Sequence, residues 1–134
     1  MTAGCKSIGH LSRETGVKVP TIRFYEQIGL MPTPQRSASD RRVYAEGATQ
    51  RLGFIRHARA LGFSIEDIRS LLLLADQPAR SCSGATELAR AQLKATEDRI
   101  ARLQCLRNEL ARLANACPGG EAERCGVIEA LSDR

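Results

Sequence analysis

The segment SIGHLSRETGVKVPTIRFYEQIG, residues 7–29, decides the fold. Ser7 is a typical helix-capping residue, and the helical spacing of apolar residues that follows it is interrupted at Gly16. Pro20 then starts a second helix, because its fixed φ suits the first turn, and Gly29 is a residue type that commonly ends one. The segment therefore predicts two short helices joined by a tight glycine turn, which is a helix-turn-helix.

The residues after this motif predict a wing and two further helices. Residues 31–40 contain two prolines, three hydroxyl residues and an aspartate, which suit a loop or small hairpin leading into residues 41–44. A third helix is expected from about Ala48 to Ala60, and Ser64 is expected to cap a fourth that runs through Leu74. Residues 1–75 are thus interpreted as a winged helix-turn-helix DNA-binding domain.

A long helical pattern follows from about residue 83 to residue 116, with apolar residues spaced by three or four. An unbroken pattern longer than about 25 residues is typical of a coiled coil. Because so small a chain offers this apolar stripe no partner, we expect it to pair with the same helix of a second subunit. The expected fold class is mainly α. The DNA-binding domain is followed by a hinge and dimerisation helix over residues 76–116, which pairs as an antiparallel coiled coil. A metal-binding loop with a short helix is expected over residues 117–134.

The charge distribution indicates a nucleic-acid partner. The chain has 20 Lys and Arg against 15 Asp and Glu, a net charge of +5, and basic residues dominate the first 60 positions, so this end is expected to meet phosphates. Guanidinium groups and phenols on the predicted turn and wing suit phosphate and base contacts, whereas a solvated basic face is the simpler alternative for any one arginine. The candidate DNA-contacting residues are Thr21, Arg23, Tyr25, Arg36, Arg41, Arg42, Tyr44 and Arg56.

Five cysteines in a chain with no leader or membrane-spanning stretch favour metal or redox chemistry, because such a chain is expected in the reducing cytosol. Cys117 and Cys125 enclose seven residues with a Pro-Gly-Gly turn, a loop that can fold both thiolates onto one ion. Cys82 precedes the long helix, and ~1.5 Å per residue places it ~50 Å from Cys117 of the same chain. An antiparallel helix pair would instead bring Cys82 of one subunit beside Cys117 and Cys125 of the other. Burial as a small apolar side chain is the alternative for each cysteine, and it is preferred for Cys5 and Cys105.

No phosphate-binding glycine loop, Ser-His-Asp set or pair of catalytic carboxylates is found in the sequence. An enzyme is therefore not expected.

Together these features resemble the MerR family along nearly the whole chain. The resemblance is carried by residues 7–17, by residues 21–30 with the distinctive string TIRFYE, by residues 42–44, 54–56 and 61–64, and by the C-terminal cysteine loop. It implies a homodimer whose winged helix-turn-helix domains, joined by an antiparallel coiled coil, sit on promoter DNA. It also implies repression without metal and, with metal, a bent and untwisted promoter that RNA polymerase can engage, since protein contacts offset the deformation energy of the DNA.

Within this family, a cysteine at the position of Cys82 is similar to what divalent-ion sensors carry, whereas monovalent copper sensors carry Ser there. Three thiolates leave a single net negative charge around a divalent ion, while two suffice for a monovalent one. The expected effector is therefore cadmium, lead, mercury or zinc. The loop 118–124 lacks the His of typical zinc-responsive relatives and offers only Glu121 or Glu123 as extra ligands, so softer ions rank above zinc.

Three alternatives stay open at this point. The chain could be a monovalent copper, silver or gold sensor of the same family, or a cytosolic metal-trafficking or storage protein. It could also be a redox regulator in which Cys117 and Cys125 form a reversible disulfide.

Overall fold

The computed structural model describes residues 6–39, 42–116 and 125–132. The chain divides into two compact units, Met1–Thr86 and Glu87–Arg134. Each unit is described by itself below.

The helix-turn-helix is formed by α1 (Ile8–Thr15) and α2 (Val19–Gln27). The Ser7 hydroxyl accepts a hydrogen bond from the backbone amide of His10 at 3.1 Å, which satisfies one of the unpaired amides of the first turn. Gly16 ends α1 with φ +76°, a left-handed conformation that costs a glycine little. Pro20 lies in the first turn of α2. The predicted helix, glycine turn and second helix are therefore confirmed, with boundaries shifted by about one residue.

A two-stranded hairpin follows as the wing. Strands β1 (Gln35–Arg36) and β2 (Arg42–Val43) are antiparallel, with Gln35 opposite Val43. Lys6 and Tyr44 extend this pairing, because each backbone amide donates to the other residue's carbonyl at 2.8 Å. The segment before α1 is thus tied to the end of the wing.

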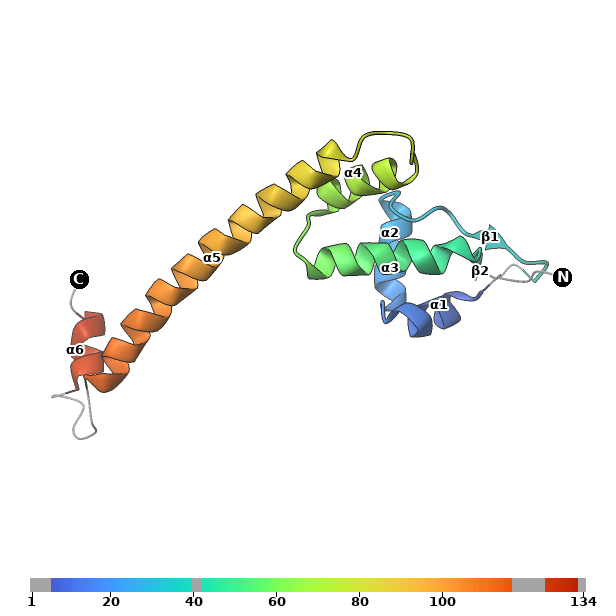
Figure 1. The fold of residues 1–134 in the computed structure, drawn as a ribbon. Helices are drawn as coiled ribbons and strands as arrows, with labels where there is room; N and C mark the ends of the chain where they lie inside the picture. Colours follow the sequence, from blue (N-terminus) through green and yellow to red (C-terminus); the bar gives the residue numbers. More distant parts are fainter. Residues whose placement is uncertain (1–5, 40–41, 117–124, 133–134) are drawn as a thin grey trace. The chain divides into compact units, whose positions relative to one another are not determined.

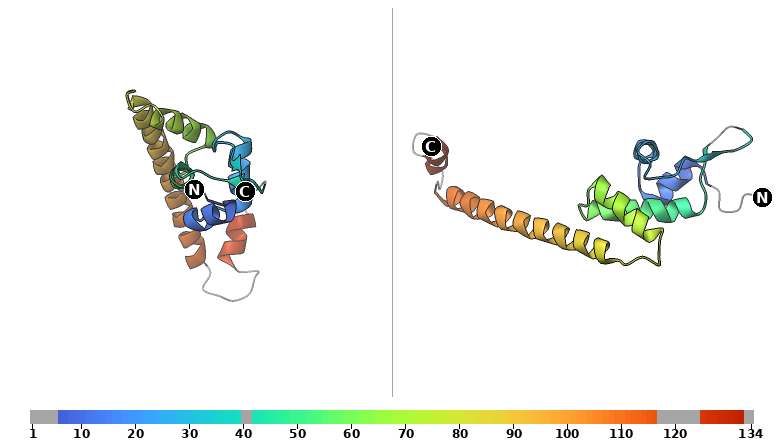
Figure 2. Two further views of the ribbon diagram at one scale, coloured as in Figure 1. Left: turned by 90° about the vertical axis from the view of Figure 1, so that its right-hand side faces the viewer. Right: turned by 90° about the horizontal axis from the view of Figure 1, so that it is seen from above.

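Two further helices close the first unit. They are α3 (Gly47–Ala60) and α4 (Ile65–Ala75), and the Ser64 hydroxyl caps α4 by accepting from the amide of Asp67 at 3.0 Å. α1 packs against both α2 and α3, and α3 packs against α4 (Figures 1 and 2). The fully buried side chains of the described residues all belong to this unit: Leu11, Ile22, Leu30, Met31, Leu52, Ile55 and Ile68.

The long helix α5 (Ser83–Asn115) has 33 residues, and a short helix α6 (Gly126–Ser132) follows it. Neither helix has a buried residue. Five apolar side chains of α5 are between 49% and 58% exposed, namely Leu93, Ile100, Leu103, Leu106 and Leu110. The predicted mainly helical fold with an N-terminal helix-turn-helix, a long helix and a short C-terminal helix is confirmed. No described helix is long and apolar enough to cross a bilayer.

Candidate DNA-binding surface and metal-binding cysteines

One face of α2 is presented to solvent. Ile22 and Tyr25 point into the core, whereas Arg23, Phe24 and Gln27 are exposed, with 48% of Phe24 accessible. Gln27 lies four positions after Arg23 and three after Phe24, so it shares one side of the helix with each of them. Arg23 lies where the sequence predicted it, and Thr21 beside it is half-buried. Phe24 and Gln27 were missed, although their spacing from Arg23 and their position opposite Ile22 would have revealed them.

The two tyrosines that were predicted to contact phosphates are buried. Tyr25 is 8% exposed and Tyr44 is 2% exposed, so both rings fill the core of the first unit. The Tyr44 hydroxyl donates a hydrogen bond to Oε2 of Glu26 on α2. Burial of its apolar ring favours the core position of each tyrosine, and the hydroxyl of Tyr44 finds a partner inside the unit. We therefore leave both tyrosines out of the DNA-contacting set.

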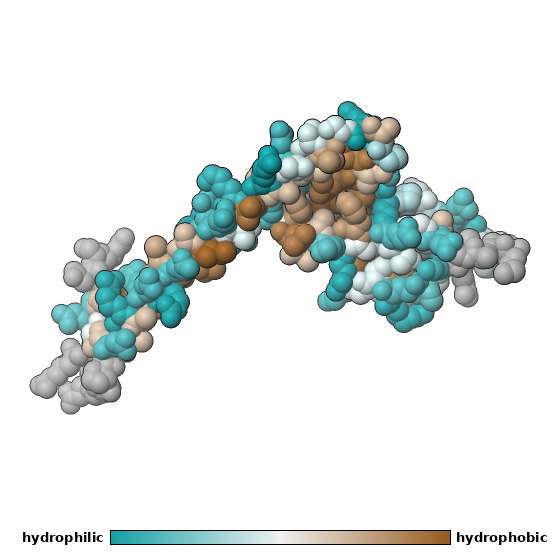
Figure 3. Space-filling model, viewed as in Figure 1, coloured by the Kyte–Doolittle hydropathy of each residue, from teal (hydrophilic) through white to brown (hydrophobic). Residues whose placement is uncertain are grey.

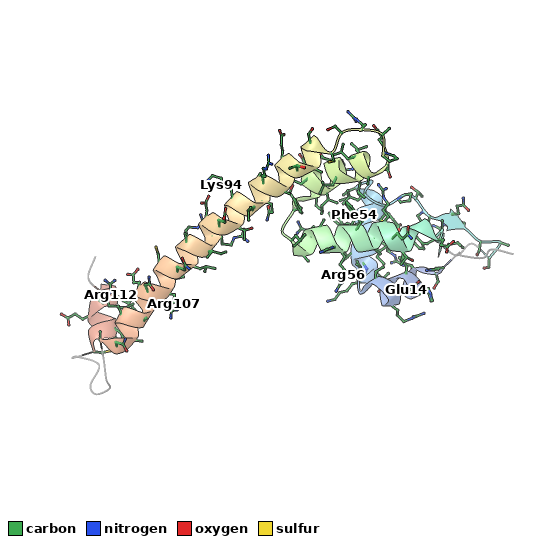
Figure 4. All side chains as sticks on the ribbon, in the orientation of Figure 1. Glu14, Phe54, Arg56, Lys94, Arg107 and Arg112 are labelled. Carbon is green, nitrogen blue, oxygen red and sulfur yellow. The ribbon has the colours of Figure 1, made fainter. Side chains whose placement is uncertain are left out.

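The remaining four predicted contacts belong to the wing and α3. Arg36 is exposed on β1, and Arg42 is its backbone partner on β2. Arg41 and the side chain of Arg42 lie outside the described residues. Arg56 is exposed on α3, and a Cβ placed at Gly16 would lie only 3.5 Å from its Nε, so its guanidinium lies against the turn between α1 and α2. Arg56 and Phe54 point to different sides of α3 (Figure 4).

Three other arginines of the basic half serve the fold instead. Each donates from its guanidinium to a backbone carbonyl at a turn, where a carbonyl has no helical partner. Arg51 Nε lies 2.7 Å from the oxygen of Leu30, and Arg59 and Arg69 make equivalent bonds at 2.8 Å. A count of basic residues along the sequence therefore overstates the charge that is available to a ligand.

The net positive charge nevertheless belongs to the first unit. Residues 1–86 contain 12 Lys and Arg against 7 Asp and Glu, whereas residues 87–134 contain eight of each. Within the first unit, Glu14 is paired with Lys6 at 2.7 Å and with His10 at 2.9 Å. The hydrogen bond from Lys6, aided by the charges of Lys6 and His10 and opposed by partial desolvation, holds the pKa of Glu14 below its ordinary value.

Two of the three predicted metal ligands lie directly before helices. Cys82 is exposed and precedes α5, and its carbonyl accepts from the amide of Thr86 at 3.1 Å. Cys125 is half-buried and precedes α6, and its carbonyl accepts from the amide of Glu129 at 3.0 Å. Each cysteine thus directly precedes the first residue of a helix and accepts one of its first backbone hydrogen bonds. Cys117 lies outside the described residues.

Gly126 and Ala116, which flank the segment 117–125, lie close together in the second unit. A Cβ placed at Gly126 would lie 2.7 Å from the carbonyl oxygen of Ala116 and 2.9 Å from its Cβ. Gly126 follows Cys125 and Ala116 precedes Cys117, so the immediate neighbours of the two cysteines are in close contact. Among the described residues no three Cys, His, Asp or Glu side chains form a metal-binding group.

Cys105 differs from its interpretation as a buried apolar side chain, because it is exposed on α5. It lies about 200° around the helix from Leu103, two residues earlier. It therefore falls on the side of α5 away from Leu103.

Comparisons with known proteins give the same family over almost the whole chain. Residues 6–74 match the family described as MerR HTH family regulatory protein, and residues 49–113 match the one described as MerR, DNA binding. The HTH-type transcriptional regulator ZntR of Escherichia coli K12 is 40% identical over 127 residues, which span 92% of this chain and 90% of that protein. The Heavy metal-dependent transcription regulator 2 of Rhizobium meliloti 1021 is 36% identical over 127 residues, spanning 95% and 86%.

A solved structure gives the same result. The transcription regulator PbrR691 from Ralstonia metallidurans CH34, crystallised in complex with lead(II), has a TM-score of 0.81 and 36% sequence identity, covering 94% of this chain and 98% of that one. The chain therefore belongs to the MerR family of helix-turn-helix regulatory proteins, which are DNA-binding transcription regulators and not enzymes.

Proposed function

We propose that this chain is a dimeric, metal-responsive regulator that binds promoter DNA through its first unit and a soft divalent heavy-metal ion through Cys82, Cys117 and Cys125. The observation that carries the proposal is the position of these cysteines, which flank α5 and α6 in the sequence, with Cys82 exposed and Cys125 half-buried directly before a helix. Two relatives support it, since one is named as heavy metal-dependent and PbrR691 was crystallised with lead(II).

The exposed face of α2 suits insertion into the major groove, so we take α2 as the recognition helix. Arginine can pair with guanine or phosphate, glutamine can pair bidentately with adenine, and an aromatic ring can contact a thymine methyl group. The wing and Arg56 then meet the flanking backbone. The proposed DNA-contacting residues are Thr21, Arg23, Phe24, Gln27, Arg36, Arg41, Arg42 and Arg56.

Dimerisation rests on uncovered apolar surface in both units. On α5 the exposed stripe includes Ile100 and Leu110, and on the first unit Phe54, Leu61 and Leu73 are between 40% and 57% exposed. Figure 3 shows apolar side chains gathered over α3 and α4 and at separate places along α5. An isolated 33-residue helix with such a stripe gains stability by pairing.

The dimer also explains how three cysteines reach one ion. Because α5 has 33 residues, a rise of ~1.5 Å per residue separates its ends by ~50 Å. Cys82 of one subunit can meet Cys117 and Cys125 only in an antiparallel partner. The contact of Gly126 with Ala116 supports the pairing of the last two cysteines on one ion.

Three thiolates suit cadmium, lead or mercury, and zinc would require a fourth ligand such as Glu121 or Glu123. The ion favours one dimer conformation by binding it more tightly than the other. In the metal-free conformation the protein represses, and in the metal-bound one it distorts the promoter so that RNA polymerase engages it.

A metal titration tests the site. Purified protein is titrated with Pb(II), Cd(II), Hg(II) or Cu(I), while thiolate-to-metal absorption and unreacted thiols are measured. About three thiols should be protected per divalent ion, and Cys82→Ser should lose divalent binding while Cys105→Ser, the matched control on α5, retains it. An unchanged divalent titration in Cys82→Ser contradicts the interfacial site, and tight Cu(I) binding that does not need Cys82 favours the monovalent alternative.

A DNA-binding measurement tests the regulatory role. The duplex that the protein selects from a random-sequence pool is compared with a scrambled duplex at physiological salt. A regulator should prefer the selected duplex by a factor of at least about 10³. Equal affinity for both duplexes would leave a metal-trafficking protein as the better account.

A further inference from the structure

The hydrogen bond between Tyr44 and Glu26 joins the end of the wing to the recognition helix across 18 positions of sequence. We infer that this pair holds the wing and α2 in the one relative position at which both can contact DNA, so that Tyr44 and Glu26 are positioning residues for sequence recognition. The inference rests on the proposed DNA-binding function and adds two residues that do not themselves touch DNA.

Tyr44 is fixed at both its backbone and its side chain. Its amide and carbonyl pair with Lys6 at 2.8 Å each, and its ring is 2% exposed. A buried phenol hydroxyl needs a partner, because an unpaired one is costly. The Glu26 carboxylate is that partner, so the ring cannot turn toward solvent without losing a charge-assisted hydrogen bond.

Glu26 lies next to Gln27 and one turn from Arg23, on a helix that must approach phosphates. A carboxylate there weakens DNA binding if it faces the groove, since like charges repel. Glu26 is half-buried, and its carboxylate accepts a hydrogen bond from the hydroxyl of the buried Tyr44. The pair thus keeps the negative charge away from the DNA-facing side while it anchors the wing.

The wing needs such an anchor because it is short. β1 and β2 have two residues each, and an isolated hairpin is at best marginally stable in water. Tyr44 directly follows β2, so its attachment to α2 sets where Arg36 on β1 lies relative to the recognition face. Because the grooves of a DNA duplex have fixed widths, the wing and α2 can contact the duplex together only at a matching distance from each other.

The test compares Tyr44→Phe, Glu26→Gln and Glu26→Ala in the full chain. Affinity for the duplex selected from a random-sequence pool and for its scrambled counterpart is measured, together with thermal unfolding and lead(II) binding. Tyr44→Phe and Glu26→Ala should lower the affinity for the selected duplex about tenfold with little change for the scrambled duplex, and lead(II) binding should be unchanged. Glu26→Gln keeps an acceptor for the hydroxyl and should retain the selectivity.

Ile68→Val provides the control for a purely structural role, because Ile68 is fully buried and belongs to α4 rather than to the wing or α2. It should lower the melting temperature and keep the selectivity. The inference is overturned if Tyr44→Phe keeps wild-type selectivity, or if Ile68→Val loses selectivity to the same degree. If the wild-type protein itself does not distinguish the two duplexes, the proposed function falls and the inference falls with it.

Discussion

The guanidinium of Arg51 on α3 donates from Nε to the carbonyl oxygen of Leu30, 2.7 Å away, in the turn that follows α2. The same side chain reaches Oδ2 of Asp76 at 3.5 Å, immediately after α4. Leu30 is 1% exposed, so its carbonyl has little access to water. Arg51 thus links the ends of two helices, and the bond to Leu30 is the stronger of its two contacts because Asp76 is largely exposed.

Arg51→Met should destabilise the protein by ~1–2 kcal/mol, because the long side chain can still pack while the Leu30 carbonyl loses its donor. The measurement is the free energy of unfolding from a urea titration. Arg80→Met is the matched control, since Arg80 is exposed and donates to Gln77 in the same loop, and it should change the stability by less than ~0.5 kcal/mol. Equal losses in both variants would contradict the role given to the Leu30 contact.

The exposed face of α2 gives a second prediction, which distinguishes a phosphate contact from a base contact. Arg23→Ala should weaken DNA binding and reduce the slope of log affinity against log salt by about one if Arg23 neutralises a phosphate. Phe24→Ala removes an exposed ring, so it should leave both the fold and the salt slope unchanged and cost ~1–3 kcal/mol on the selected duplex alone. Affinities are measured over a range of potassium chloride concentrations. Wild-type affinity in Phe24→Ala would remove that ring from the contact set.

The ends of several helices in the first unit could be predicted because their signals are local. Ser7 and Ser64 cap helices within three residues of themselves, and Gly16 ends α1 through its own backbone conformation. Such interactions depend only on nearby sequence, so a single chain displays them.

The roles of the aromatic and basic side chains could not be predicted in the same way. Tyr44 and Arg51 find their partners 18 and 21 positions away, and nothing near them in the sequence distinguishes a core tyrosine or a capping arginine from a DNA contact. For the proposed metal site the sequence predicts the candidate ligands Cys82, Cys117 and Cys125, but their assembly, which in the proposed dimer involves a second subunit, cannot be read from one chain. Residues whose environment is set by the tertiary fold are those for which sequence reasoning is weakest.

Acidification gives a third prediction through Glu14. Its pKa is lowered from 4.5, chiefly by the hydrogen bond from Lys6, so its contribution to stability is present above the unfolded-state pKa and is lost as the pH falls through the lower folded-state value. Wild-type protein should therefore lose stability more steeply below about pH 4.5 than Glu14→Gln does. Melting temperatures recorded from about pH 6 to about pH 3 check this. Parallel curves for the two proteins would show that the ion pair does not survive in solution.

The contact between Gly126 and Ala116 gives the last prediction. A Cβ at position 126 would lie 2.7 Å from the Ala116 carbonyl oxygen, which is closer than real Cβ atoms approach other atoms. Gly126→Ala must therefore push α6 away from the end of α5. We expect weaker lead(II) binding, because the neighbours of Cys117 and Cys125 would no longer touch, while affinity for DNA in the absence of metal stays at the wild-type level. Gly53→Ala on α3 is the control, since a Cβ there meets nothing within 4 Å, and it should gain up to ~1 kcal/mol from helix propensity without affecting lead(II) binding. Lead(II) affinity that is equal in Gly126→Ala and wild type would mean that the two cysteines reach the ion without this contact.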